Sequence, residues 1–313
     1  MKADSLQVLN PGAGHRGSFR WLACVGVAWT AIQLGAVGQE LLATNQVNPD
    51  LTTPLAATAT PEEKPWSSFL PMMKEEALAR GHELPLPFGV GFVYNYLERD
   101  IKVTDVRVGI NGQPMQSVSD FLDLGSNSRV NAALLKVDAW LLPFLNVYAL
   151  GGYLDNQSTS IGHVTVGAQQ FDFQVPTSIN GFVGGGGLSL GAGYQNFFLA
   201  LDANYTQTDL GFDDSFRAIV ASVRTGWFGK IGSAPVRIWV GGVYWDTANT
   251  ASSTVQVAGV GTVQFEADQG PRNPWNANVG GSVGIGRSWE CYADYGFNLD
   301  DVRIFATGLT WRF

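Results

Sequence analysis

Side-chain alternation with a period of two runs from Pro87 to the end of the chain and limits the folds open to it. Apolar residues at every second position face one way and small or polar residues face the other, as in a β-strand with two different faces. Turn-forming residues separate ten such segments, at 88–96, 132–141, 145–153, 182–194, 197–206, 219–227, 236–246, 275–285, 289–297 and 303–313. Each segment is about ten residues long, the length that a tilted strand needs to cross a bilayer. Segment 236–246 is apolar on both faces, so its orientation stays open.

The last segment shows the alternation most clearly. Phe305, Leu309, Trp311 and the terminal Phe313 share one face, and the other face carries small or polar residues that end with Arg312. An exposed C-terminal aromatic residue is explained if this face meets lipid and Trp311 and Phe313 lie in an interfacial aromatic girdle. The ending resembles that of Gram-negative outer-membrane β-barrels. The resemblance implies that the assembly machinery reads this strand and its final Phe.

Connection lengths supply an independent argument. If Phe313 ends in the periplasm, the periplasmic connections are short, at 142–143, 195–196, 229–235 and 286–288, and the opposite connections are long, at 99–126, 156–179 and 247–273. Short periplasmic turns and long outer loops are typical of outer-membrane barrels. The sequence therefore predicts an all-β fold, an antiparallel transmembrane β-barrel of about 10 strands over residues 87–313, similar to small porin-like proteins of the Gram-negative outer membrane. Residues 101–109 and 164–175 also alternate, which leaves 12 strands as an alternative, but we interpret them as strand extensions above the membrane.

Composition agrees with a barrel. Only 15% of the residues are charged, and the chain holds 38 Gly, 18 Phe, 10 Trp and 9 Tyr, a pattern that fits a barrel better than a helical enzyme. The mean hydropathy of +0.04 is that of alternating strands, whose polar half hides the apolar half.

The N-terminal part is predicted to direct secretion. Residues 1–38 have a basic region, an apolar stretch and small residues before Gln39, and are interpreted as a secretory signal peptide. Residues 39–65 lack periodicity and are interpreted as a flexible linker. Residues 66–86 are predicted to hold a short amphipathic periplasmic helix and the approach to the barrel, with Trp66, Phe69, Leu70, Met73 and Ala77 on one face. This helix either docks on the surface or plugs the barrel from the periplasm.

Charged and amide side chains fall on the inward face of the alternation. The candidate lumen and selectivity residues are Lys136, Asp138, Asp202, Asn204, Arg224, Glu290, Asp294 and Arg312. Charges that face a lumen avoid the cost of contact with lipid. Eight strands are just filled by their own side chains, so ten leave a narrow passage. The interior is therefore either a closed ion-paired core or a narrow pore for ions and small solutes, in which Asp138, Asp202, Glu290 and Asp294 would favour cations.

Two other functions stay open. One is an enzyme at the outer rim, similar to omptin proteases, with His163 in the second long loop and Asp155, Asp213 or Asp214 as the partner carboxylate. The other is adhesin-like binding through the long loops. No catalytic residue, metal site or cofactor is predicted.

The expected location is the Gram-negative outer membrane, and the expected partners are membrane lipid, lipopolysaccharide and the assembly machinery. Removal of residues 1–38 would leave 16 basic against 26 acidic residues, a balance that argues against nucleic acid. Cys291 would then be the single cysteine, which forbids an intrachain disulfide.

Overall fold

The computed structural model describes residues 7–8, 68–79, 84–118, 122–166, 169–209, 216–246, 249–257, 261–270, 273–298 and 302–313. The predicted signal and linker lie outside these ranges, apart from Gln7 and Val8. The elements are β1 (Gln7–Val8), α2 (Lys74–Ala79), β2 (Phe88–Ile110), β3 (Gln116–Ser117), β4 (Leu122–Leu142), β5 (Leu145–Val166), β6 (Gln169–Tyr194), β7 (Phe197–Asp209), β8 (Phe216–Ile231), β9 (Ala234–Asp246), β10 (Asn249–Val257), β11 (Gly261–Gly270), β12 (Trp275–Ile285), β13 (Trp289–Phe297) and β14 (Val302–Arg312).

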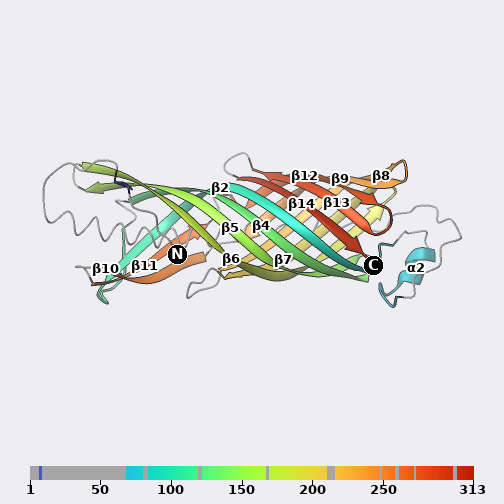
Figure 1. Cartoon of the computed structure of the whole chain (residues 1–313), viewed down its shortest axis with the longest axis horizontal. Coiled ribbons are helices and arrows are strands. Elements are labelled where there is room, and N and C mark those ends of the chain that lie inside the picture. The colour runs from blue at the N-terminus through green and yellow to red at the C-terminus, as the bar shows by residue number, and fades with distance from the viewer. Residues whose placement is uncertain are drawn as a thin grey trace.

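Ten of these strands close into an antiparallel barrel within the described part of the chain (Figure 1). The order around the barrel is β2, β4, β5, β6, β7, β8, β9, β12, β13 and β14. The ring closes because β2 pairs with β4 on one side and with β14 on the other. Apart from β14, which pairs with β2 to close the ring, each barrel strand pairs with the barrel strand that follows it in sequence. The connections therefore join neighbouring strands. The predicted strand number and fold class are confirmed.

The outer face of the barrel is apolar. Exposed and buried residues alternate strictly along β7, and almost as strictly along β14. Leu135, Leu199 and Leu309 are among the large apolar side chains that point outward. Strands of this length, tilted as in Figure 1, carry the apolar face across the hydrocarbon region of a bilayer. A closed sheet leaves no unpaired edge in lipid, so the chain is a transmembrane barrel of the outer-membrane type.

Aromatic rings mark the C-terminal end of the barrel. The rings of Trp289, Trp311 and Phe313 follow one another at centroid distances of 6.4 and 4.6 Å, and Phe313 stacks on Phe88 at 6.0 Å. Phe313 also exchanges two backbone hydrogen bonds with Phe88, of 3.0 and 3.2 Å. The terminal strand therefore closes the barrel through the residues that the sequence assigns to the assembly signal.

The tight turns also lie at this end, which identifies it as the periplasmic end. In the described ranges they occupy residues 143–144, 195–196, 232–233 and 286–288. The predicted turn at 229–235 was too wide, because β8 and β9 continue pairing to Ile231 and Ala234. Gly232 and Gly286 have positive φ angles of 64°, which glycine adopts without steric cost.

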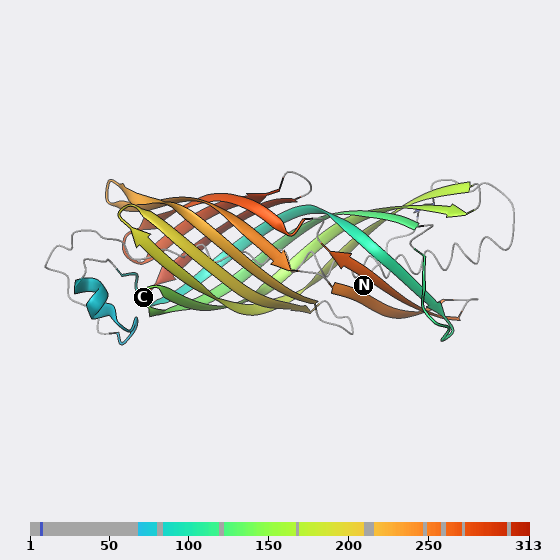
Figure 2. The ribbon, with the colours of Figure 1, turned by 180° about the vertical axis from the view of Figure 1, so that it is seen from behind.

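The opposite end carries strand extensions where the sequence analysis expected loops. β2, β5 and β6 contain 23, 22 and 26 residues and rise beyond the shorter strands (Figures 1 and 2). The interpretation of 101–109 and 164–175 as extensions is thus confirmed, and 156–179 is largely a long hairpin.

The prediction of a loop at 247–273 was wrong, because β10 and β11 form a hairpin there. β11 pairs with the outer part of β2, from Lys102 to Ile110, so the hairpin reaches past the ends of β12, β13 and β14. The alternating runs 254–257 and 263–266 are the strand signal that this hairpin has in the sequence.

α2 lies outside the periplasmic end of the barrel, near the C-terminus (Figures 1 and 2). It has six residues, none of them buried, and Phe69 is 80% exposed. The helix is shorter than predicted because Pro71 and the positive φ of Met73 precede it. The backbone N–H of Met72 donates to the carbonyl of Leu141 at 2.9 Å. The residues before the helix thus contact the barrel rim, and the described part of this segment lies outside the lumen (Figures 1 and 2). Among the described residues, no helix is long and apolar enough to cross a membrane.

Candidate functional site

The barrel interior holds all the predicted lumen residues. They are between 3% and 8% exposed, and they come from five different strands: Lys136, Asp138, Asp202, Asn204, Arg224, Glu290, Asp294 and Arg312. The alternation dictates this placement, since each has the inward parity of its strand. Their contacts divide them into three groups.

The first group surrounds Asp138 on β4. Arg312 of β14 forms an ion pair with one carboxylate oxygen at 3.0 Å, and Asn146 of β5 donates to the same oxygen at 2.8 Å. The ammonium of Lys136 lies 3.7 Å from the other oxygen and 5.9 Å from the ring centroid of Tyr148. The single negative charge of Asp138 thus compensates one of the two positive charges of Lys136 and Arg312. Its contacts link β4, β5 and β14.

The second group surrounds Asp202 on β7. Tyr148 donates its hydroxyl to this carboxylate at 3.0 Å, Asn204 donates an amide N–H at 3.4 Å, and Ser189 also donates to it. The donors come from three strands and are uncharged. The carboxylate is therefore fixed by hydrogen bonds.

The third group lies on the β9, β12 and β13 wall. Trp239 donates its indole N–H to Asp294 at 2.5 Å, and Asn278 donates to the same carboxylate at 2.9 Å. The guanidinium of Arg224 lies over the Trp239 ring, 5.6 Å from its centroid. A separate ion pair joins Arg237 of β9 to Glu290 of β13 at 2.5 Å.

Arg237 was missed as a lumen residue because segment 236–246 is apolar on both faces. The charge of Arg237 could have placed it inside the barrel, since an arginine side chain on the lipid face is energetically costly. The structure turns Trp239, Val243 and Trp245 inward and leaves Ile238 and Val240 exposed outward.

A shared feature of the three groups is an inward glycine between the interacting residues. Gly89 stands in register between Arg312 and Asp138. Gly187 stands between Tyr148 and Asn204, and Gly280 between Trp239 and Asp294. A Cβ on Gly187 would lie 2.6 Å from the Tyr148 hydroxyl, and one on Gly280 would lie 2.7 Å from the Trp239 ring. The long side chains therefore pass over glycines and lie along the wall.

Of the catalytic pairs considered at the outer rim, the structure describes both members of the His163–Asp155 pair alone. His163 lies on β5, in the outer hairpin, with Asp155 on the same strand. Eight residues of strand separate their Cα atoms by roughly 26 Å, too far for a direct hydrogen bond. Asp213 and Asp214 lie outside the described residues. Within the described ranges there is no group of three or more His, Cys, Asp or Glu residues placed to hold a metal ion, and Cys291 is a free, half-buried thiol.

Comparisons with known proteins find similarity in structure alone. No protein-family model matches the chain, and no curated protein matches it in sequence. The outer membrane protein OprG from Pseudomonas aeruginosa is 11% identical with a TM-score of 0.40, covering 74% of this chain and 99% of OprG. The Ralstonia pickettii toluene transporter TbuX is 9% identical with a TM-score of 0.36, covering 74% of this chain and 90% of TbuX.

A third solved structure is the translocator domain of the autotransporter NalP from Neisseria meningitidis. It is 12% identical with a TM-score of 0.32, covering 77% of this chain and 94% of that domain. The barrel assignment rests on the closed sheet and its apolar outer face, independently of these similarities.

Proposed function

We propose that the barrel is a narrow passive conduit for small solutes across the outer membrane. The observation that carries this proposal is the course of the interior side chains. Arg312, Tyr148 and Trp239 have long side chains, yet each bonds to a carboxylate on its own wall, across a strand with a glycine in register with it. Since ten strands enclose more space than the eight that side chains just fill, this course favours a passage along the axis.

Charge selectivity of this conduit is expected to be weak. Among the described residues of the barrel interior, the buried carboxylates are Asp138, Asp202, Glu290 and Asp294, and the buried cations are Arg99, Lys136, Arg224 and Arg312. Half-buried Arg237 adds a further cation beside Glu290. Opposite charges that are paired or fixed by hydrogen bonds compensate each other's field along the wall. The cation preference expected from the four carboxylates alone is therefore reduced.

Liposome swelling tests the proposal. The protein is purified from outer membranes, its folded state is verified by the mobility of the unheated gel band, and it is reconstituted into liposomes placed in isotonic arabinose, a small uncharged solute. A conduit gives swelling in proportion to the protein content. A folded barrel that gives no swelling above protein-free liposomes would reject the conduit and leave a closed structural barrel.

A further inference from the structure

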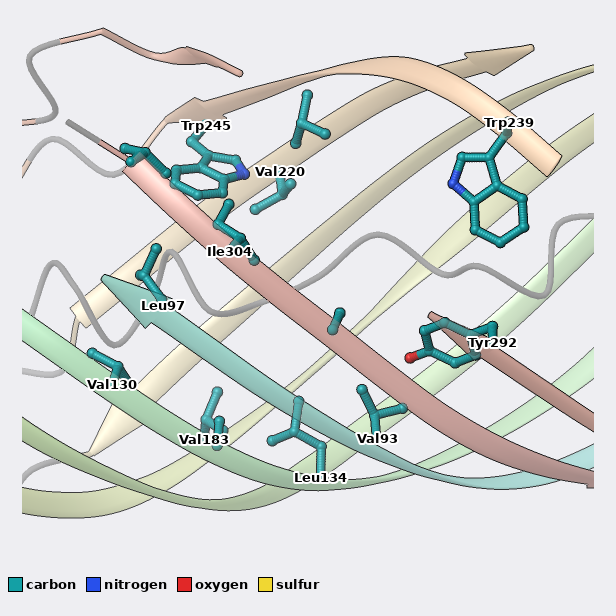
Figure 3. Packing of buried hydrophobic residues seen from close by; sticks show 14 of the residues in the cluster. Val93, Leu97, Val130, Leu134, Val183, Val220, Trp239, Trp245, Tyr292 and Ile304 are labelled. Atoms are coloured by element: carbon teal, nitrogen blue, oxygen red, sulfur yellow. The ribbon is translucent and has the colours of Figure 1, made fainter. Parts of the chain in front are cut away.

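The lumen also contains an apolar layer. Six inward side chains from six strands belong to one contacting cluster and are at most 5% exposed: Leu97 of β2, Val130 of β4, Val183 of β6, Val220 of β8, Trp245 of β9 and Ile304 of β14. We call this set the apolar belt. Figure 3 shows its members pointing from different strands into the same interior space.

The belt surrounds the lumen. Ile304, Leu97 and Val130 are register partners on three adjacent strands, and Val220 and Trp245 are partners on two others. In the ring of ten strands, β2 stands five strands from β8, and β4 stands five strands from β9. Leu97 therefore faces the wall that bears Val220, and Val130 faces the wall that bears Trp245.

Polar side chains flank the belt on both sides along β2 and on its outer side along β4. Toward the outside, the next inward residues after Leu97 and Val130 are Arg99 and Ser128, and Ser128 donates its hydroxyl to Asn156 at 2.7 Å. Toward the periplasm, the next inward residue on β2 is Asn95, which is also buried, whereas on β4 the apolar lining continues through Ala132 and Leu134. The charged groups around Asp138, Asp202 and Asp294 follow. A solute moving inward along the axis thus meets polar side chains on β2 and β4, then the apolar belt, and then a lining in which apolar and charged side chains are mixed.

We infer that the apolar belt is a desolvation barrier that makes the conduit discriminate against ions and in favour of small uncharged solutes; this inference rests on the proposed function. An ion must shed water to pass, and the belt offers no group that replaces its hydration apart from the indole N–H of Trp245. Transfer of a charge into apolar surroundings costs far more than transfer of a hydroxyl or amide, so an uncharged solute is hindered less. Hydrophobic constrictions oppose ion flow by excluding water.

The test introduces hydroxyl groups into the belt with little change of shape. The double variant Val130→Thr/Val220→Thr is compared with Val137→Thr/Val223→Thr, which changes lipid-facing positions on the same two strands, 46% and 43% exposed. Each protein is purified from outer membranes and assayed for KCl current in planar bilayers and for swelling in arabinose. The belt variant is expected to raise KCl conductance several-fold with a much smaller change in swelling. The lipid-face variant is expected to match the wild type in both assays.

Failure of the inference about the belt and failure of the proposed conduit give different results. If the wild type gives swelling in arabinose but the belt variant has the same KCl conductance as the wild type, the inference about the belt is overturned. The proposed conduit would still stand. Absence of both swelling and current from folded wild type and folded belt variant would overturn both. If the double variant fails to give a folded gel band, Val183→Thr alone carries the same expectation of increased KCl conductance, and an unchanged conductance would again overturn the inference.

Discussion

The passage of interior side chains over glycines predicts a large difference between two alanine substitutions on β6. Gly187 faces inward, and an added Cβ would lie 2.5 Å from the carbonyl oxygen of Ala203, 2.6 Å from the Tyr148 hydroxyl and 2.7 Å from the Asn204 Cβ. Gly184 faces outward, and an added Cβ there meets nothing within 4 Å. The two positions share a strand and a chemical change, so Gly184→Ala is the matched control.

The magnitude follows from two effects. Forcing a methyl group into a packed interior costs about 1–3 kcal/mol, and here a backbone carbonyl is among the atoms that must move. Displacing the Tyr148 hydroxyl weakens its 3.0 Å hydrogen bond to the Asp202 carboxylate, a bond to a charged group worth about 1.5–3 kcal/mol. Gly187→Ala should therefore lower the free energy of unfolding by about 2–5 kcal/mol. Gly184→Ala should change it by less than about 0.5 kcal/mol.

The assay is urea unfolding of the barrel in lipid vesicles, followed by tryptophan fluorescence. A double-mutant cycle with Tyr148→Phe then isolates the contribution of the hydroxyl. Because that hydroxyl lies over Gly187, the cost of Gly187→Ala should fall in the Tyr148→Phe background, with a coupling energy of about 0.5–3 kcal/mol. Equal stability of the Gly187→Ala and Gly184→Ala variants, or full additivity in the cycle, would refute the reasoning.

Three further substitutions have defined outcomes. Asp138→Ala leaves the cations of Lys136 and Arg312 without their shared carboxylate and should destabilise the barrel by about 3–5 kcal/mol in the same urea assay, whereas a loss below about 1 kcal/mol would show that the pairing is unimportant. Cys291→Arg places a charge on the outward face of β13 and should cost up to about 2–4 kcal/mol, while Cys291→Ala should be nearly silent; equal tolerance of both would contradict the facing of that strand. Phe313→Ala removes the ring contacts with its two aromatic neighbours, and pulse-chase measurement of the folded gel band should show slower assembly in cells; an unchanged rate would separate these contacts from assembly.

The sequence was sufficient for the ten barrel strands and, apart from β9, for their faces, because the side-chain period of two is a local property of the chain. The alternation placed Asp202 and Arg224 inside and Leu309 and Trp311 outside, as the structure does. It also anticipated the extension of β2, since alternation continued past residue 100.

Contacts that depend on register could not be predicted in the same way. Nothing in the sequence near Tyr148 says that Gly187 stands beside it, because pairing across strands is fixed by the closed sheet as a whole. The belt was missed for a related reason. Inward Leu97 and Val130 have the same side chains as residues that meet lipid, and they lie at or beyond the ends of the segments assigned from sequence. The β10–β11 hairpin was not predicted because its alternating runs, 254–257 and 263–266, are only four residues long.

A cysteine scan along β14 tests the central claim, that one face of each strand meets lipid and the other a water-filled lumen. In a Cys291→Ala background, single cysteines replace the inward residues Ala306, Thr310 and Arg312 and the outward residues Phe305, Leu309 and Trp311. The reconstituted proteins are treated with a charged, membrane-impermeant thiol reagent. The account predicts modification with a period of two, with Thr310 and Arg312 most reactive and the outward positions protected. Reaction at the outward positions, or no reaction at any inward position, would contradict it.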